Sequence, residues 1–356
     1  MTPLDPGAVI GILGGGQLGR MLSVAASRLG FRTHIYEPAP EPPASDVSWR
    51  TTTAGYDDAE ALKAFAASVD VVTYEFENVP AEALDLIEAV VPIRPNRKAL
   101  AISQDRLDEK TFLTELGLTT APFAKVDTAG DLAAAMAQIG LPGILKTRRL
   151  GYDGKGQARI TGAQDTDAAF AAMQGAPAIL EGFVDFSREI SVIAARSLSG
   201  DVAAYDPGEN IHEGGILRTT TVPARLAVEH KTSAVLLAGK ILNALDYVGV
   251  IGVELFVTHN GLVVNEFAPR VHNSGHWTQN GCAIDQFEQH IRAIAGLPLG
   301  DGSRHADVVM ENLIGDDIAR LSEIVADPGA SLHFYGKGQA RPGRKMGHVN
   351  RVSAKT

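Results

Sequence analysis

The chain has 356 residues, with 32 Lys and Arg against 42 Asp and Glu, which gives a formal net charge of −10. That length suggests roughly two or three domains. Hydrophobic residues make up 45% of the chain and charged residues 21%, proportions that fit a globular protein and exclude wholesale disorder. The acidic balance argues against nonspecific binding to nucleic acid or to an anionic membrane surface.

The single cysteine, Cys282, excludes an intrachain disulfide and a cysteine-based zinc site, and we interpret it as a small buried residue. No run approaches the ~20 apolar residues that span a bilayer. Residues 1–13 contain no basic residue before their apolar part, so we expect no signal peptide and a cytoplasmic location.

The first hundred residues alternate short apolar runs with helical stretches. Strands are predicted at residues 8–13, 33–36, 69–73 and 90–94, and helices at residues 17–29, 57–68 and 81–89. Such β-α-β alternation is typical of a doubly wound parallel sheet. We therefore expect an α/β domain at the N-terminus.

The rest of the chain has a different pattern. Helices are predicted at residues 105–116, 130–139 and 228–245, and strands at residues 123–126 and 143–147. Several β-like segments within residues 178–221 predict an antiparallel sheet, and residues 248–257 and 262–267 predict a hairpin. A linker-like stretch after Gly296 precedes a small C-terminal unit rich in strand signals.

A glycine turn, G-x-G-x-x-G at residues 14–19, follows the first strand and opens the first helix. Backbone N–H groups at such a helix N-terminus favour phosphate. Glu37 ends the next strand, where a dinucleotide site has its ribose-binding acid. By itself the motif indicates a nicotinamide or flavin cofactor, and it also fits another anion site or a purely structural tight turn.

A second glycine-rich loop follows Lys146, which ends an apolar strand. Gly151, Gly154 and Gly156 permit close approach of the backbone to oxyanions, and Lys146 and Lys155 add positive charge. The sequence has no Walker A motif. An exposed surface loop with ordinary charges is the alternative interpretation.

Two glutamates, Glu254 and Glu266, lie on the two strands of the predicted hairpin. A two-residue loop would place them on opposite faces, whereas a three-residue loop, residues 259–261, would make them face each other directly. Opposed carboxylates repel unless a cation lies between them, and ligation by oxygen alone suits Mg²⁺. The alternative is a pair of unrelated exposed acids, which their apolar neighbours disfavour.

Polar side chains are dense directly after this hairpin, where Arg270, His272, Asn273 and Ser274 follow one another closely. So many hydrogen-bond donors suit an anionic substrate or transition state. The basic run at residues 341–348 could hold a phosphate or could be a solvated tail.

Together these motifs resemble the ATP-grasp superfamily and, within it, the N5-carboxyaminoimidazole ribonucleotide synthetase family of purine biosynthesis. The resemblance rests on six stretches in family order that span nearly the whole chain: GGGQLGR (14–20), TYEFEN (73–78), GYDGKGQ (151–157), GGILRT (214–219), NEFAPRVHNSGHW (265–277) and RPGRKMGH (341–348). The fifth stretch is the most specific to this family.

The resemblance implies a three-part fold of mixed α/β and α+β class. The parts would be a ribonucleotide-binding domain over residues 1–100, an ATP-grasp domain over residues 101–300 with a small lid subdomain at about 120–184, and a C-terminal unit over residues 301–356 that completes the site. The glycine turn would then hold the 5′-phosphate of aminoimidazole ribonucleotide instead of a dinucleotide.

The resemblance also implies a set of site residues. Those that bind ATP would be Arg106, Lys146, Gly151, Tyr152, Asp153, Gly154, Lys155, Gly156, Gln157, Glu181, Gly182, Phe183, Val184, Glu189, His212, Asn265 and Glu266. Those that contact the ribonucleotide or bicarbonate would be Gln17, Leu18, Glu75, Tyr152, Asp153, Lys155, Arg270, His272, Asn273, Ser274, Arg344 and Lys345. Glu254 and Glu266 would hold Mg²⁺ or Mn²⁺, and the catalytic residues would be Asp153, Lys155, Arg270 and Lys345.

The reaction implied by the resemblance has two steps. Bicarbonate attacks the γ-phosphorus of ATP to give carboxyphosphate and ADP, and the amine of the ribonucleotide then captures the carboxyl carbon or the CO₂ released from it. A homodimer and a functional link to the mutase that follows in the pathway are also implied. The alternatives are another ATP-grasp ligase such as a formate-dependent glycinamide ribonucleotide transformylase, an NAD(P)-dependent oxidoreductase, and a non-catalytic nucleotide-binding module.

Overall fold

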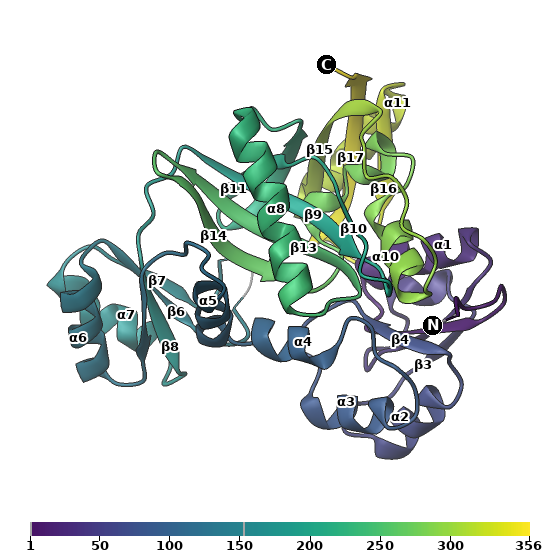
Figure 1. Cartoon of the computed structure of the whole chain (residues 1–356), viewed down its shortest axis with the longest axis horizontal. Helices are drawn as coiled ribbons and strands as arrows, with labels where there is room; N and C mark the ends of the chain where they lie inside the picture. The colour runs from purple at the N-terminus through teal and green to yellow at the C-terminus, as the bar shows by residue number, and fades with distance from the viewer. Residues whose placement is uncertain (1, 152–153) are drawn as a thin grey trace.

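The computed structural model describes residues 2–151 and 154–356, and these residues form three β-sheets (Figure 1). In Figure 1 a small sheet lies with α6 and α7 at the left, the N-terminal sheet lies with α2 and α3 at the lower right, and a large sheet lies between and above them. Predictions that involve Tyr152 and Asp153 concern residues outside the described part of the chain.

The N-terminal sheet is wholly parallel, in the order β3-β2-β1-β4. Its strands are β1 (Val9–Leu13), β2 (Arg32–Tyr36), β3 (Arg50–Thr52) and β4 (Val71–Tyr74). Its helices are α1 (Gln17–Arg28), α2 (Ala59–Ala66) and α3 (Ala81–Glu88).

Alternate side chains of β1 show why helices cover both faces of this sheet. Ile10 and Ile12 pack in the cluster that contains α1 and α10 (Gln286–Ile294), whereas Leu13 packs with α2 and α3. A strand buried on both faces is continuously apolar, which is the pattern from which the parallel sheet is predicted. The doubly wound sheet is therefore confirmed.

Two details of this region differ from the sequence prediction. Residues 90–94 form no strand, and only an isolated parallel bridge joins Ile93 to Val72. Pro92 and Pro95 flank that bridge and have no N–H group, so they cannot extend the ladder. The short strand β3 is missed because its three residues, Arg-Thr-Thr, carry no apolar signal.

The small sheet has the antiparallel order β5-β8-β6-β7. Its elements are β5 (Phe123–Val126), α6 (Ala129–Ile139), β6 (Gly143–Thr147), β7 (Gln157–Ile160), α7 (Thr166–Ala172) and β8 (Ala178–Gly182). Two helices lead into it from the N-terminal sheet, α4 (Arg97–Ser103) and α5 (Arg106–Glu115). The predicted strands 123–126 and 143–147 are confirmed, whereas α4 is missed.

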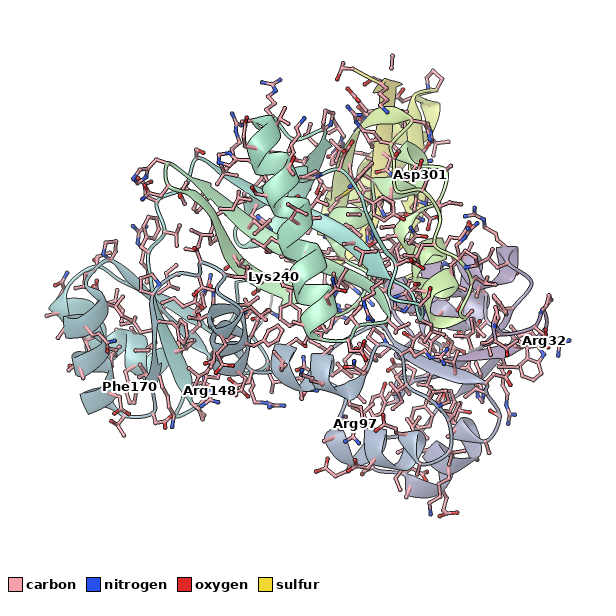
Figure 2. All side chains as sticks on the ribbon, in the orientation of Figure 1. Arg32, Arg97, Arg148, Phe170, Lys240 and Asp301 are labelled. Carbon is pink, nitrogen blue, oxygen red and sulfur yellow. The ribbon has the colours of Figure 1, made fainter. Side chains whose placement is uncertain are left out.

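Arg148, labelled in Figure 2, follows β6 and ties the small sheet to the rest of the chain. Its guanidinium donates to both carboxylate oxygens of Asp105, at 2.7 to 3.1 Å. Asp105 is also the N-cap of α5, where it accepts from the Leu107 N–H at 2.9 Å. A bidentate pair of this kind fixes orientation as well as distance.

The large sheet has the order β14-β13-β9-β11-β12-β15-β17-β16, with β10 paired to β9. Its strands are β9 (Arg188–Arg196), β10 (Val202–Ala204), β11 (Gly208–Glu213), β12 (Ile216–Val222), β13 (Gly249–Thr258), β14 (Gly261–Ala268), β15 (Ala306–Ile314), β16 (Ala330–Phe334) and β17 (Lys345–Ala354). The remaining α-helices are α8 (Val228–Ala244), α9 (Thr278–Gly281) and α11 (Leu321–Ala326). Helix α8 covers one face of this sheet, where Ala238 and Ile241 pack against Val192 and Val253.

The C-terminal strands continue the large sheet, because β12 pairs with β15 and β15 pairs with β17. The basic run at residues 341–348 therefore ends inside a strand, where His348 is buried. The solvated-tail interpretation of that run is wrong. Cys282 is buried and unpaired, as predicted. No helix in residues 2–151 or 154–356 is both long and apolar enough to cross a membrane.

Candidate active site

A cavity of about 600 Å³ lies where the three sheets meet. Its wall brings together residues that are far apart in the sequence, from the first glycine turn to β17. The sequence-predicted residues that line it are Gln17, Leu18, Glu75, Arg106, Lys146, Gly151, Gly154, Gln157, Glu189, His212, Glu254, Asn265, Glu266, Arg270, His272, Asn273 and Lys345.

Glu254 and Glu266 pair directly across β13 and β14, as predicted, but for a different reason. The hairpin loop has two residues, since Thr258 pairs with Gly261. A β-bulge between Leu255 and Glu254 then shifts the register by one residue and brings the two acids opposite each other. The three-residue loop is therefore wrong, and the bulge supplies the missing residue.

The same bulge places two consecutive side chains on one face of β14. Val264 and Phe267 pack into the core under α8, while Asn265 and Glu266 between them both line the cavity. The spacing of apolar residues along β14 changes from two to three at this point. That change of spacing is a signal for a bulge that the sequence already contains.

The two opposed acids have different electrostatic surroundings. Burial alone would raise the pKa of Glu266, but Arg106, whose Nη1 lies 2.7 Å from Glu266 Oε2, and Lys146 lower it to about 2. Burial and the Glu266 charge raise the pKa of Glu254 to about 7. Glu266 is therefore ionised, whereas the positive charge near Glu254 is too small to offset its burial and its repulsion by Glu266.

This donor set fits a hard cation. Among the described residues there is no group of three or more His, Cys, Asp or Glu side chains arranged to hold a metal ion. Two facing carboxylates with the Asn265 side chain beside them suit Mg²⁺, which keeps several waters and takes few protein ligands when phosphate oxygens are available.

A buried cluster of ionised groups lies next to Asn265 and consists of Lys110, Lys146 and Glu181. Lys146 Nζ lies 3.1 Å from Glu181 Oε2, and Lys110 Nζ lies 3.3 Å from the same oxygen. Lys110 also donates to the Asn265 carbonyl at 2.7 Å. Burial would raise the pKa of Glu181, but the two lysines lower it. Sequence reasoning missed Lys110, which resembles any surface lysine of a helix until the fold buries it.

His212 and Glu189 form an ion pair in the cavity wall. Burial lowers the pKa of the His212 imidazole, but its hydrogen bond with Glu189 and the charge of Glu254 raise it overall.

Three N–H groups of the glycine turn, those of Gly15, Gly16 and Gly19, are taken by acids of the chain. The Gly16 and Gly19 N–H groups donate to the two carboxylate oxygens of Glu75, the second at 2.6 Å. The Gly15 N–H donates to Glu37 Oε2 at 2.9 Å. These bonds disfavour binding of the ribonucleotide 5′-phosphate at these three amides, and a phosphate held by the turn stays a prediction. A dinucleotide pyrophosphate is disfavoured for the same reason.

Arg270 is oriented by an acid that sequence reasoning missed. Its Nε lies 2.6 Å from Glu77 Oε2, and its Nη2 lies 3.3 Å from Glu77 Oε1. Burial would raise the pKa of Glu77, but Arg270 lowers it. Glu77 follows Glu75 by two residues in the TYEFEN stretch, directly after a predicted strand. This spacing could have indicated that both acids lie at the site.

Comparison with known proteins agrees with this geometry. Family models match the ribonucleotide synthetase preATP-grasp domain at residues 8–104, the ATP-grasp domain at residues 111–287 and the phosphoribosylaminoimidazole carboxylase C-terminal domain at residues 308–356. The N5-carboxyaminoimidazole ribonucleotide synthase of Brucella melitensis is 57% identical over 358 residues, which cover 100% of this chain and 99% of that protein. The chain belongs to the N5-carboxyaminoimidazole ribonucleotide synthase family.

Solved structures of the N5-carboxyaminoimidazole ribonucleotide synthase family have the same fold. An ADP complex of such a synthetase superposes with a TM-score of 0.96 at 41% identity, covering 99% of this chain and 94% of that one. The Aspergillus clavatus enzyme in complex with ADP and 5-aminoimidazole ribonucleotide superposes with a TM-score of 0.93 at 32% identity, covering 98% and 94%. The predicted ATP-grasp fold is confirmed.

Several residues that the synthase family suggested lie outside the cavity wall of the described chain. They are Lys155, Gly156, Glu181, Gly182, Phe183, Val184, Ser274 and Arg344. The Phe183 ring lies under the Arg159 guanidinium, 4.9 Å from its centroid, and Arg344 Nη1 donates to the Gln339 carbonyl at 2.9 Å. Ser274 is fully buried and bonded to His272 Nδ1 at 2.8 Å, so it does not face a ligand.

Sequence reasoning about the synthase site also missed part of the wall. These residues are Phe76, Glu77, Asn78, Ile144, Phe186, Gly215, Leu217 and Phe256. The rings of Phe186 and Phe256 stack, with centroids 4.5 Å apart. Phe256 shares a strand face with Glu254, two residues away, and Ile144 shares one with Lys146. Strand alternation was therefore the usable signal for these two.

Proposed function

We propose that the protein is the ATP-dependent ligase that converts 5-aminoimidazole ribonucleotide and bicarbonate into N5-carboxyaminoimidazole ribonucleotide in purine biosynthesis. The observation that carries the proposal is one cavity that joins Lys146, the opposed carboxylates and the cluster around Arg270. The names of the relatives support it. ADP and phosphate would be the other products.

We assign one task to each part of the chain. Residues 1–100 would bind the ribonucleotide, residues 101–300 would bind ATP with a lid at about 120–184, and residues 301–356 would complete the site. The position of Gln17, Lys146 and Lys345 in one cavity wall supports this division, because each comes from a different part.

ATP would lie between the small sheet and the large sheet. Arg106 and Lys146 supply positive charge for its phosphates, and the apolar wall of Ile144, Leu217 and Phe256 suits a purine ring. Glu189, in the cavity wall, would accept hydrogen bonds from the ribose hydroxyls. Glu181 lies outside that wall, its Oε1 is buried with no partner among the described residues, and it would face the adenine side. An unsatisfied buried oxygen costs free energy that a ligand donor can recover.

Mg²⁺ would be held by Glu254 and Glu266, with Asn265 beside them. The raised pKa of Glu254 fits this role, because a cation between the two acids removes the repulsion that raises it. When bound, the ion would neutralise phosphate charge and polarise the group that is transferred. Mn²⁺ has similar ligand preferences.

The ribonucleotide would lie between the N-terminal sheet and β17. An ionised carboxylate has about four acceptor sites, of which the glycine amides use two at Glu75, so Glu75 can still accept from ribose hydroxyls. Because Glu37 and Glu75 occupy the amides of Gly15, Gly16 and Gly19, the 5′-phosphate would be bound by Lys345, assisted by Lys155 and Arg344. Gln17 and Leu18 would contact the same ligand.

In the first step, a bicarbonate oxygen would attack the γ-phosphorus of ATP and ADP would leave. Arg270 is held by Glu77 and cannot lose its proton, so it contributes a fixed positive charge for bicarbonate. Arg106 and Lys146 would offset the charge on the phosphoryl group during transfer. Positioning and electrostatic stabilisation of this kind supply most of the rate in phosphoryl transfer.

In the second step, the exocyclic amine of the ribonucleotide would attack the carboxyl carbon, either in carboxyphosphate or as CO₂ released from it. The C–N bond forms, phosphate leaves and the amine loses a proton. Asp153, which lies outside the described residues, is our candidate for orienting or deprotonating the amine. Asn273 and His272 line the cavity where the carboxyl group would lie.

We also propose a homodimer that acts in the cytoplasm, with its product passing to the mutase of the next pathway step. The family resemblance supports these assignments. Light scattering coupled to size-exclusion chromatography tests the dimer, because a monomer of 356 residues is half its mass.

The proposed function is tested by ADP release from ATP and bicarbonate, with and without aminoimidazole ribonucleotide. We expect turnover that depends strongly on both co-substrates. Turnover with formate in place of bicarbonate would instead indicate a transformylase, and ATP hydrolysis indifferent to the ribonucleotide would contradict the assigned acceptor. The absence of ADP in the presence of Mg²⁺ would reopen the nicotinamide alternative.

A further inference from the structure

His272 lines the cavity and is held from behind by two side chains that ligands do not reach. Ser274 and Gln286 are both 0% exposed. Ser274 belongs to the 3₁₀ turn Asn273–Gly275, and Gln286 is the first residue of α10. Neither has a role in the proposed function as described so far.

Gln286 clamps the backbone of His272 on both sides. The His272 N–H donates to Gln286 Oε1 at 2.9 Å, and Gln286 Nε2 donates to the His272 carbonyl at 2.7 Å. Because a backbone N–H only donates and a carbonyl only accepts, these bonds fix which end of the amide is oxygen. The second Nε2 hydrogen reaches His276 Nδ1 at 3.1 Å. A Cβ at Gly275 would lie 2.5 Å from Gln286 Oε1, so only glycine fits beside the clamp.

Ser274 determines which ring nitrogen of His272 carries the hydrogen. The Ser274 hydroxyl lies 2.8 Å from His272 Nδ1, and the Ser274 backbone N–H also points at this atom, at 3.4 Å. The backbone N–H can only donate, so Nδ1 must be an acceptor and the hydroxyl donates to it as well. The neutral ring therefore carries its hydrogen on Nε2.

The Nε2 atom points to the side of the cavity where Glu254 lies. Its distance to Glu254 Oε1 is 3.6 Å, beyond hydrogen-bond range, so this acid leaves the Nε2–H available for a ligand within the described part of the chain. Because Nδ1 accepts the Ser274 N–H, it carries no hydrogen, and a ring with its hydrogen on Nε2 alone is neutral.

We propose that Ser274 and Gln286 are positioning residues that lock His272 as an Nε2–H donor to an anionic oxygen of bicarbonate and of its phosphorylated form. The inference rests on the proposed function for the identity of the ligand, whereas the lock itself is a property of the chain alone. It excludes His272 as the base for the ribonucleotide amine, because the only free lone pair of the ring is already used by Ser274.

The lock is tested by ¹⁵N NMR of the ring nitrogens in the full-length, ligand-free protein near neutral pH. The His272 signals are those lost in His272→Gln. We expect Nε2 to be protonated and Nδ1 to be unprotonated, and we expect Ser274→Ala to add a population with the hydrogen on Nδ1. Ser23→Ala, which removes another buried hydroxyl in α1, should leave the His272 signals unchanged. A ring protonated on Nδ1 in the unsubstituted protein would overturn the proposal.

The role in catalysis is tested by steady-state ADP release with bicarbonate and ATP varied separately. We expect Ser274→Ala and Gln286→Glu to lower kcat/KM for bicarbonate by about 10- to 100-fold, with the KM for ATP within about twofold. Ser274→Cys, which keeps a weak donor of similar size, should lose less than Ser274→Ala. Equal losses for both co-substrates would contradict the proposal.

Gln289→Glu is the matched control for the clamp. Gln289 is equally buried on α10 and clamps Gly300 in the same way, with its Oε1 accepting from the Gly300 N–H and its Nε2 donating to the Gly300 carbonyl, both at 2.8 Å. A loss in Gln289→Glu that matches Gln286→Glu would show a general packing effect and sink the positioning role. Failure of the proposed function itself is distinguishable, because the unsubstituted protein would then show no ribonucleotide-dependent turnover while the NMR result stands.

Discussion

Two groups of carboxylates line one cavity, and the chain surrounds them with different partners. At the N-terminal sheet, Glu75 receives backbone N–H groups from Gly16 and Gly19. At the large sheet, Glu254 and Glu266 face each other, and of the two only Glu266 has an arginine within ion-pair distance, Arg106 at 2.7 Å. Glu75 is therefore stabilised by hydrogen-bond donors of the chain, whereas Glu254 and Glu266 repel each other.

The difference teaches what each wall can bind. A carboxylate that already accepts from two amides can still accept from hydroxyl groups of a ligand. Two opposed carboxylates with too little positive charge favour a cation. We name the side of the cavity at Glu75 the sugar-binding wall and the side at Glu254 and Glu266 the metal-binding wall, after the ligands that we propose for them.

The largest expected effect comes from Glu266→Gln, which removes charge from the metal-binding wall without changing shape. We expect turnover of Mg·ATP to fall by at least about 100-fold, because the variant loses both a metal ligand and the partner of Arg106. The measurement is ADP release at saturating ribonucleotide and bicarbonate. Glu213→Gln, an exposed acid at the end of β11, is the control. Full turnover at saturating Mg²⁺ would remove Glu266 from the metal site.

Glu75→Ala should convert the sugar-binding wall into an anion site. The substitution frees the Gly16 and Gly19 N–H groups at the N-terminus of α1, so we expect inorganic phosphate to bind there. We also expect kcat/KM for the ribonucleotide to fall by about tenfold or more, because charged hydrogen bonds to its hydroxyls are lost. Isothermal titration with phosphate is the direct measurement.

Glu37→Ala is the matched control for Glu75→Ala, since it frees the Gly15 and Ala39 N–H groups and leaves those of Gly16 and Gly19 bound to Glu75. Phosphate binding that appears equally in both variants, or in neither, would contradict the distinction between the two walls.

Lys345→Ala should separate the two walls kinetically. Lys345 is our candidate for binding the 5′-phosphate, so we expect KM for the ribonucleotide to rise about tenfold while KM for ATP changes less than about twofold. Lys63→Ala, which removes a surface lysine paired with Glu60 on α2, serves as the control. Equal changes for both substrates would place Lys345 elsewhere.

Most of the fold was predictable because its elements carry strong periodic patterns. The strands of the parallel sheet are short apolar runs, and α1, α5, α6 and α8 occur where the sequence predicts helices. Residues 90–94 are mostly apolar and so suggest a strand, but Pro92 within them and Pro95 after them cannot donate to a ladder. The continuation of the large sheet through β15 and β17 rests on contacts between distant segments, which local patterns do not contain.

The residue types of the site were predictable from the sequence, but the contacts between these residues were less so. The facing of Glu254 and Glu266 follows from a bulge, although the apolar spacing around Asn265 already indicates it. No local pattern predicts the hydrogen bonds between Glu75 and the glycine amides, because Gly19 and Gly16 precede Glu75 by 56 and 59 residues. Side chains such as Lys110 and Gln286 gain their roles only through burial, which depends on the whole fold.

The smallest expected effect is on stability, and it concerns His290 of α10, which connects the two walls through hydrogen bonds to β4 and β13. Its Nε2 lies 2.8 Å from Thr73 Oγ1 on β4, and its Nδ1 accepts from the Val250 N–H on β13 at 3.1 Å. Burial lowers the pKa of His290 to about 3. The unfolded chain, in which histidine titrates near 6.5, therefore takes up the proton first as the pH falls. The stabilisation is complete above that value and is lost progressively as the pH falls from about 6.5 toward 3, by roughly 1.4 kcal/mol per pH unit for this residue.

Chemical denaturation at pH 7.5, 6.0 and 5.0 measures this joint through the free energy of unfolding. In His290→Gln, whose amide can keep both hydrogen bonds but does not titrate, we expect the loss of stability between pH 6.0 and 5.0 to be smaller by about 1.4 kcal/mol. His259→Gln, in the exposed hairpin loop, should follow the unsubstituted protein. A pH dependence in His290→Gln equal to that of the unsubstituted protein would mean that the walls are joined mainly by the apolar packing of α10 against β1 and β13, with no measurable contribution from this imidazole.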